Sequence, residues 1–350
     1  MNTKVFVKLE FDKILKMLAN KALSDSGKRE AVSLKPSKSI SAVTRLQSET
    51  LEAESTLMRS AKTPMSGFSD ISSETSRLKA GADLSCRELL RILGVLKSAR
   101  RAKRGLVKVE GSTNLLPHMA EQLYYDDGMI TELDDAIMSD SELADTASHE
   151  LFNIRKRIMR ENEGIREKLN AVIRSSHHKE HLQDAIVTMR SGRYVVPVKQ
   201  EFKRNIKGLV HDQSASGQTV FIEPMEVVEA NNKLRELELA EREEVERILH
   251  VFSERLREFW SELKNNLNIL TRLDVIFAKA ALASTMKASP VTITDEKKII
   301  IKNGRHPLID AKEVVPVSLH IDEGYSGLII TGPNTGGKTV TLKLTGLLAL

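Results

Sequence analysis

The sequence predicts a multidomain, mainly α-helical protein that carries a small antiparallel β module and, near its C-terminus, the start of an α/β domain. Apolar residues recur at helical spacing through most of the chain, runs of β-branched residues interrupt that spacing once, and a glycine-rich motif ends in Gly-Lys-Thr. In chain order, we expect a helical core over 1–150, an outgoing helix over 151–184, a β-rich module over 185–223, a returning helix and core over 224–289, and the α/β domain over 290–350.

The composition is that of a globular protein with room for two or three domains. Of the 350 residues, 41% are hydrophobic, 29% are charged and 4% are aromatic, and the last value disfavours an extensive platform for stacking bases. The net charge of +5 permits a nucleic-acid partner without requiring one. The single cysteine, Cys86, excludes an internal disulfide and a cysteine-based zinc site, and we expect it to be a small helical core residue.

The N-terminus has no signal-peptide pattern, and the chain contains no run of about 18 apolar residues, which is the length that crosses a bilayer. We therefore expect a soluble cytoplasmic protein with no membrane partner.

The N-terminal region is predicted to be all-helical. Its apolar residues follow helical spacing, and Pro36, Pro64 and Gly81 divide the pattern into separate helices. The predicted stripes are Leu9, Ile14, Leu15, Leu18 and Leu23, then Leu46, Leu51 and Leu57, then Leu89, Leu90, Leu93 and Leu96.

Two long helices are predicted on either side of the β-rich module. Their apolar positions are Leu151, Ile154, Ile158, Ile165, Leu169 and Val172 in the outgoing helix, and Val245, Ile248, Phe252, Leu256, Phe259, Leu263, Leu267 and Leu270 in the returning one. Because the chain leaves along one helix and comes back along the other, we expect an antiparallel helical hairpin with the β module at its far end.

The β module is predicted from four short β-branched runs, which are Ile186–Met189, Tyr194–Val198, Gly208–Val210 and Thr219–Ile222. Six basic residues and one acidic residue, Glu201, fall between positions 190 and 207 of this module. The basic residues are Arg190, Arg193, Lys199, Lys203, Arg204 and Lys207. This charge density favours contacts to nucleic-acid phosphates, although a solvated lysine-rich face gives the same pattern.

Two other polar clusters have simpler interpretations. Arg155, Lys156, Arg157 and Arg160 lie on the outgoing helix and are typical of a helix surface. His177, His178 and His181 lack the companion glutamate and the third ligand of a helical zinc site, so we expect a solvated helix end.

The glycine-rich motif matches the phosphate-loop pattern. It lies between Gly327–Thr331, predicted to be a buried strand, and Val340–Leu348, predicted to be a helix. In that context Lys338 reaches the β- and γ-phosphate oxygens and the Thr339 hydroxyl ligates Mg²⁺. ATP and Mg²⁺ are therefore the expected cofactors, and the predicted site is Gly332, Pro333, Asn334, Thr335, Gly336, Gly337, Lys338 and Thr339.

Two further strands, Val291–Thr294 and Lys298–Ile301, are predicted to open the α/β domain after a boundary at Pro290. The motif ends at Thr339, which is 350 − 339 = 11 residues before the last residue of the sequence. A phosphate-loop ATPase also needs an Asp/Glu pair on a later strand, and these 11 residues do not supply it. We assign no catalytic residue and expect that this chain alone does not turn over ATP.

Several segments match a known family in wording as well as in pattern. They are Leu9–Leu15, Arg190–Lys199, His211–Thr219, Phe221–Pro224, Gly304–Pro307, Val315-Pro316 and Thr331–Lys343. Together they resemble the MutS-type ATPases, and in particular the N-terminal part of the bacterial MutS-two subfamily, truncated just after the Walker A motif. The resemblance implies a helical core, antiparallel lever helices, a β clamp and the start of a P-loop ATPase domain.

The resemblance also implies a function. Such proteins are DNA-clamping ATPases in which two subunits close around double-stranded or branched DNA and share nucleotide sites. The subfamily is associated with suppression of homologous recombination and, in some members, with splitting of collided ribosomes. By position, Val314 and Val315 match the family's adenine-contacting strand. Complete members add an Asp-Glu magnesium motif, a signature helix and a C-terminal Smr nuclease domain, so hydrolysis, dimerisation and nuclease activity belong to the family rather than to these residues.

Two other functions stay open at the level of sequence. A coiled-coil ATPase of recombination or chromosome structure also joins a phosphate loop to long arms, although there the loop usually precedes the arms. A ribosome- or rRNA-binding module would grip rRNA through the same basic residues, because phosphate contacts carry no base code.

Overall fold

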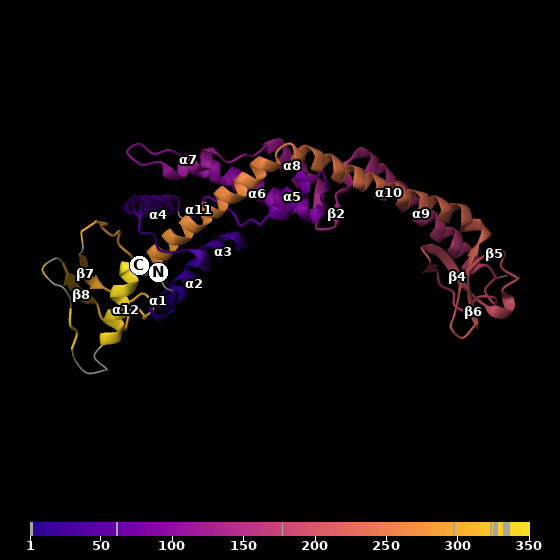
Figure 1. Cartoon of the computed structure of the whole chain (residues 1–350). Helices are drawn as coiled ribbons and strands as arrows, with labels where there is room; N and C mark the ends of the chain where they lie inside the picture. The colour runs from indigo at the N-terminus through magenta and orange to yellow at the C-terminus, as the bar shows by residue number, and fades with distance from the viewer. Residues whose placement is uncertain are drawn as a thin grey trace. The chain divides into compact units, whose positions relative to one another are not determined.

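The computed structural model describes residues 3–60, 62–176, 178–296, 298–322, 324, 328–331 and 337–350. Within these residues the protein is mainly helical and carries short antiparallel sheets, as the sequence predicts (Figure 1). No described helix is long and apolar enough to cross a bilayer.

The chain divides into two compact units. Unit 1 comprises residues 1–80, 88–130 and 258–350, and unit 2 comprises residues 81–87 and 131–257. The domain boundaries proposed from the sequence stay predictions.

Unit 1 is built around α11 (Trp260–Met286), which buries residues along its whole length. The helices in contact with it are α2 (Phe11–Ala19), α3 (Asp25–Ser33), α4 (Ile40–Ser60), α5 (Ser72–Lys79) and α7 (Leu115–Glu121). Unit 1 also contains α1 (Thr3–Lys8), most of α6 (Cys86–Gly105) and the start of α8 (Asp127–Ala136).

A buried aspartate fixes α3 to α11. The backbone N–H groups of Leu23 and Ser24 each donate to the Asp274 carboxylate over 2.9 Å, and the Ser24 hydroxyl donates to it over 2.6 Å. Ser24 in turn caps α3 by accepting from the backbone N–H of Gly27 over 2.9 Å. A Cβ atom on Gly27 would lie 2.2 Å from the Asp274 carboxylate, so this contact requires glycine.

The predicted apolar stripes of unit 1 fare differently. In α6, Leu89, Leu93 and Leu96 are buried as predicted, and Cys86 is a buried residue at the start of the helix. In α4 the predicted helix forms, but its apolar stripe is only partly buried: Leu46 and Leu57 are half-buried and Leu51 is 40% exposed. The buried residues of α4 are Glu49, Ala53 and Thr56. Glu49 is buried because its carboxylate pairs with the guanidinium of Arg272 on α11 over 2.5 Å.

In unit 2, α9 (His149–Arg174) and α10 (Met225–Arg257) pack side by side and antiparallel, as predicted (Figure 1). The Ser148 hydroxyl at the start of α9 donates to Glu244 over 2.6 Å, and Arg155, further along α9, donates to Glu241 over 2.7 Å. Residue numbers therefore rise along α9 as they fall along α10, which is the antiparallel arrangement. Unit 2 also contains the short hairpin β1 (Ile137–Ser139) and β2 (Glu142–Leu143), followed by a 3₁₀ turn at Asp145–Ala147.

The returning helix is not continuous. The sequence predicts one apolar stripe through Leu270, but α10 ends at Arg257 and α11 begins at Trp260. Between them Phe259 leaves the helical conformation, with φ −115° and ψ 21°, and stacks on Tyr124 with the ring centres 4.8 Å apart. This tertiary contact favours a break that periodicity does not indicate.

The β module of unit 2 is a four-stranded antiparallel sheet in the order β3-β4-β6-β5. Its strands are β3 (Thr188–Arg190), β4 (Arg193–Lys199), β5 (Gly208–Gln213) and β6 (Thr219–Pro224), with a 3₁₀ turn at Gln200–Phe202 after β4. Ser191 and Gly192, with φ of 51° and 74°, form the two-residue turn of the β3–β4 hairpin.

One face of the sheet and the adjoining halves of α9 and α10 share a core. Val196, Val198, Val220 and Ile222 of the sheet pack in one buried cluster with Ile165 and Leu169 of α9 and Val227 and Leu234 of α10. Every second residue of β4 and β6 belongs to this cluster, as expected for residues on one face of a strand, although both faces of β4 are buried. The antiparallel pairing of the four strands confirms the small β module.

The C-terminal part of unit 1 contains the hairpin of β7 (Ile299–Gly304) and β8 (Val317–Ile321) and the helix α12 (Lys338–Ala349). The helix predicted over Val340–Leu348 is confirmed. The strand predicted at Val291–Thr294 is wrong, because this segment is a linker whose Val291 carbonyl accepts from the Gln47 side chain over 2.9 Å.

The strand predicted before the phosphate loop, Gly327–Thr331, is also not formed in the part that the structure describes. Gly327 lies outside the described residues, and Leu328–Thr331 are not in a strand. Leu328 is 51% exposed and Ile329 is 87% exposed, so no described strand covers them, and an unpaired extended segment has no ladder of hydrogen bonds to hold it.

Candidate functional site

The last residues of the glycine-rich motif form the entry to α12. Gly332, Pro333, Asn334, Thr335 and Gly336 lie outside the described residues. Gly337 immediately precedes the helix with φ 77°, a left-handed conformation that favours glycine, and a Cβ atom there would meet nothing within 4 Å. The conformation, rather than space, therefore requires glycine at this position.

Lys338 and Thr339 are the first two residues of α12. The first backbone N–H groups of a helix have no partner within it and carry a partial positive charge, which favours an anion. The first turn of α12 contains no acidic residue, Lys338 is half-buried and Thr339 is exposed. These residues fit a phosphate group and a magnesium ion: the ammonium supplies a cation and the hydroxyl supplies an oxygen ligand.

The β7–β8 hairpin supports α12. Leu344 is fully buried, and a Cβ atom on Gly304 of β7 would lie 3.5 Å from its side chain. His306, two residues after the end of β7 at Gly304, is also buried. Burial lowers the pKa of its imidazole below the ordinary value. The backbone N–H of Leu308 points to His306 Nδ1 at 3.4 Å, a contact that suits the neutral ring.

Val314 and Val315 are not in a strand. They follow a turn and precede β8, which begins at Val317, and Val315 is 77% exposed. The match to an adenine-contacting strand is therefore wrong in its secondary structure, because pairing with β7 starts at Gly304↔Val317. Their role toward the base stays a prediction.

The basic residues of the β module fall into two groups. Arg193 is engaged inside the module: its guanidinium donates to the Glu223 carboxylate over 2.9 and 3.1 Å and to the Asn232 side chain over 2.6 Å. Arg190 lies over the Phe221 ring, 4.0 Å from its centre, and pairs with Asp212 over 3.2 Å. Lys199 donates to the Glu180 carbonyl over 3.0 Å.

Lys203, Arg204 and Lys207 form the second group, which we call the exposed basic group. All three are exposed in the β4–β5 connection. No ion pair joins them to a carboxylate among the described residues. Their charges are therefore the ones in this module that are best placed to meet an external phosphate.

Sequence reasoning missed Glu223, which organises the module. It is fully buried in β6, and besides Arg193 its carboxylate contacts His211 Nε2 at 2.5 Å and accepts from Asn231 over 2.8 Å. His211 lies at a bulge in β5, between Val210 and Asp212. A carboxylate in the middle of an otherwise apolar strand sequence, Phe221–Pro224, is the signal that could have found it.

The other two clusters match their simple interpretations in part. Arg155 is bound on the α9 surface to Glu241 and to Asp145, the latter over 2.5 Å. His177 lies outside the described residues, while His181 contacts the Asn205 side chain at 3.2 Å. Among the described residues no group of three or more His, Cys, Asp and Glu side chains is placed to hold a metal ion.

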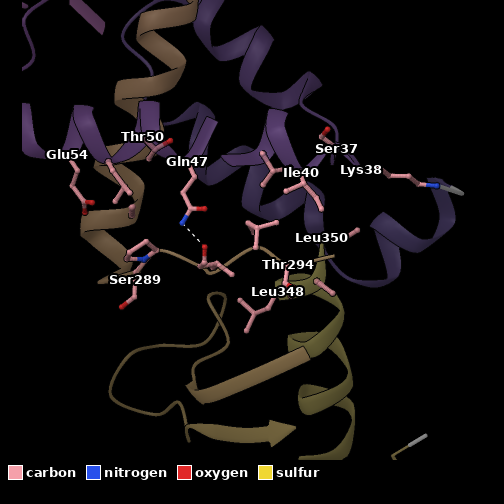
Figure 2. Close-up of a pocket in the computed structure, with 18 residues that line it drawn as sticks. Ser37, Lys38, Ile40, Gln47, Thr50, Glu54, Ser289, Thr294, Leu348 and Leu350 are labelled. Carbon is pink, nitrogen blue, oxygen red and sulfur yellow. Dashed lines mark hydrogen bonds between the residues drawn. The ribbon is translucent and has the colours of Figure 1, made fainter. Parts of the chain in front are cut away.

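A cavity of about 510 Å³ lies in unit 1 between α4, the 288–294 linker and the end of α12. Figure 2 shows Ile40 and Gln47 of α4 among the residues around it, together with Leu348 of α12 and Leu350, which follows that helix; the Gln47 side chain is turned toward the linker. Most of its lining is aliphatic or small, with Lys38 and Glu54 among the lining residues. Nothing in its lining selects a particular ligand.

No protein-family model matches the chain. Curated relatives do match it, at 40–44% identity and with the alignment covering all of the chain. Over its whole length, the chain is similar to proteins named Endonuclease MutS2.

The MutS2 relatives include those of Alkaliphilus metalliredigens, 44% identical over 352 residues, Acetivibrio thermocellus, 44% identical over 354 residues, and Clostridioides difficile, 40% identical over 353 residues. In each case the match covers 100% of this chain but only 44–45% of the relative. The chain thus spans less than half the length of the MutS2 proteins it matches. The likeness supports a MutS-type protein and agrees with the resemblance carried by the sequence motifs.

Proposed function

We propose that this chain is the N-terminal, nucleotide- and DNA-binding part of a MutS-family protein of the MutS2 type. The observation that carries the proposal is the end of the glycine-rich motif, where Gly337 in a left-handed conformation places Lys338 and Thr339 in the first turn of α12. The likeness to MutS2 proteins along the whole chain supports it.

The two residues would have separate roles. Lys338 would neutralise the β- and γ-phosphates of ATP, and the first backbone N–H groups of α12 would donate to the same phosphates. Thr339 would ligate the magnesium ion, whose charge screens the phosphates when it is bound. Its hydroxyl has a place to do so because the Thr339 side chain is exposed rather than engaged in the core.

Nucleic-acid binding is proposed for unit 2. The exposed basic group would bind the phosphate backbone of double-stranded or branched DNA, while Arg193 would hold the module together through Glu223. Suppression of recombination, homodimer formation and nuclease activity are proposed for the longer protein, following the name of its relatives and the family resemblance.

A ribosome- or rRNA-binding function is the second candidate, and the same exposed basic group favours it because RNA presents the same phosphates. Competition binding separates the two: the chain is bound to labelled branched DNA and challenged with unlabelled duplex DNA or ribosomes. DNA function predicts that duplex competes at lower nucleotide concentration, and the reverse order supports the ribosomal role.

The nucleotide assignment is tested by equilibrium titration with a fluorescent ATP analogue. Lys338→Ala removes a charge-assisted contact that contributes about 1.5–3 kcal/mol, so affinity should fall about 10- to 100-fold. Lys302→Ala is the matched control, because Lys302 is an exposed lysine of β7 in the same unit. Equal affinities for the wild type and Lys338→Ala would remove the phosphate-binding role.

A further inference from the structure

Glu10 has an unusual backbone conformation. It connects α1 to α2 with φ 59° and ψ 28°, in the left-handed region that residues with a Cβ atom rarely adopt. Its side chain makes no capping hydrogen bond to α2. A disfavoured conformation persists where surrounding contacts hold it, and such positions often serve function.

Glu10 is held in part by a contact with a residue close to the C-terminal end of the sequence. Its carboxylate accepts from Lys343 of α12 over 2.7 Å, 333 residues away, and also from Lys13 one turn further along α2. The hydrogen bonds from Lys13 and then from Lys343 lower the pKa of the Glu10 carboxyl to about 2. Glu10 is therefore ionised throughout the physiological pH range.

The neighbouring residue packs against the same helix. A Cβ atom on Gly346 of α12 would lie 2.6 Å from the Leu9 side chain, so glycine at this position permits the approach. Glycine in a helix interior lowers helix stability, and its presence here is explained by this close contact. Leu9 and Glu10 together form what we call the α1–α2 corner.

Apart from the α1–α2 corner, the described contacts cover α12 only in part. On one side α12 contacts the β7–β8 hairpin through the buried Leu344. Near its C-terminal end it borders the cavity of Figure 2, where Leu348 and Leu350 line an opening instead of a filled core. The corner therefore supplies both a packing contact and an ion pair to a helix that is only partly surrounded.

We propose that Glu10 is a positioning residue for the nucleotide site: by holding Lys343 and seating Gly346 against Leu9, the α1–α2 corner orients α12, and so sets where Lys338 and Thr339 meet a phosphate. Lys343 lies five residues after Lys338 on the same helix, about 7.5 Å along its axis. Glu10 touches no nucleotide itself. The inference rests on the proposed nucleotide-binding function.

If the corner and the phosphate site are linked, the link acts in both directions. Fixing the corner should favour nucleotide binding, and bound nucleotide should stabilise the corner. The second effect is one that a residue with only a structural role would not produce.

The test uses the chain with three single changes and one exchange of charges. Glu10→Gln and Lys343→Met each remove the ion pair with α12, whereas Lys13→Met removes only the local partner of Glu10 and is the matched control. The double variant Glu10→Lys with Lys343→Glu restores an ion pair of opposite orientation. Each variant is titrated with a fluorescent ATP analogue, and its amide hydrogen exchange is measured with and without the analogue.

We expect Glu10→Gln and Lys343→Met to weaken analogue binding about two- to fivefold, as for a partly exposed ion pair, with Lys13→Met unchanged and the double variant recovering part of the loss. The analogue should slow amide exchange in α2 of the wild type and not in Glu10→Gln. Equal weakening by Lys13→Met, or unchanged binding by Glu10→Gln, overturns the inference while leaving the nucleotide site in place.

A wild-type chain that binds no analogue would count against the proposed function instead. The positioning role is then decided by exchange alone. Faster exchange of α12 amides in Glu10→Gln than in Lys13→Met supports it, and equal exchange in the two variants overturns it.

Discussion

Lys338 and Thr339 lie next to each other at one helix end but differ in the chemistry they offer. An ammonium acts on phosphate charge with or without a metal, whereas a threonine hydroxyl is a useful ligand only when a cation is present. The difference makes their roles separable by magnesium alone.

Thr339→Ala should therefore weaken binding of an ATP analogue in magnesium and have little effect in EDTA, because the lost hydroxyl acts through the metal. Fluorescence titration under both conditions measures this. Thr339→Ser keeps the hydroxyl and should bind like the wild type. Losses of equal size with and without magnesium would contradict the metal-ligand role.

Glycine positions give a second test at the residue scale, this time of packing. Gly27→Ala would place a Cβ atom 2.2 Å from the Asp274 carboxylate, and such overpacking destabilises by about 1–3 kcal/mol. Gly94→Ala is the matched control in the interior of α6, where an added Cβ atom meets nothing within 4 Å and should stabilise by about 0.5–1 kcal/mol. Urea unfolding measures both, and a Gly27→Ala variant as stable as Gly94→Ala would show that the contact between α3 and α11 is not tight.

Among single residues, the sequence indicates chemistry better than contacts. The motif identifies Lys338 and Thr339 because its spacing is itself the chemical requirement. It cannot show that Arg193 is engaged by Glu223, since the two are 30 positions apart and meet only when β4 pairs with β6. For the same reason nothing in the sequence connects Glu10 to Lys343.

At the scale of elements, the exposed basic group belongs to one connection of the sheet and can be removed without touching the core. Replacing Lys203, Arg204 and Lys207 by Ala should reduce the magnitude of the slope of log K against log salt by about 2 to 3, if each lysine or arginine meets one phosphate. Duplex binding measured between low and moderate salt gives the slope.

The matched control for this change is the triple replacement of Lys156, Arg157 and Arg160, which are exposed basic residues on α9 of the same unit. Its slope should equal that of the wild type. An unchanged slope in the first variant, or an equal reduction in the control, would place the phosphate contacts elsewhere or spread them over the whole unit.

The elements that periodicity predicts well are those stabilised by their own pattern. The α9–α10 hairpin and the sheet each bury a continuous apolar face, so spacing alone finds them. The predicted strand at Val291–Thr294 does not form because a strand needs a partner. The predicted stripe of α4 does not include the buried Glu49, because this residue is buried by pairing with Arg272 on another helix.

At the scale of the whole molecule, the two proposed binding functions fall in different units. The nucleotide motif enters α12 in unit 1, and the exposed basic group lies in the β module of unit 2. The likeness to MutS2 proteins spans both units but covers less than half of each relative, so the activities of the longer protein stay proposals.

Amide hydrogen exchange on the chain, alone and with either ligand, tests this division most directly. An ATP analogue with magnesium should slow exchange in the first turn of α12, around Lys338 and Thr339, and branched DNA should slow exchange in the β4–β5 connection, around Lys203 to Lys207. The account would be contradicted if the analogue left the exchange rates of α12 unchanged, or if DNA left those of the β4–β5 connection unchanged.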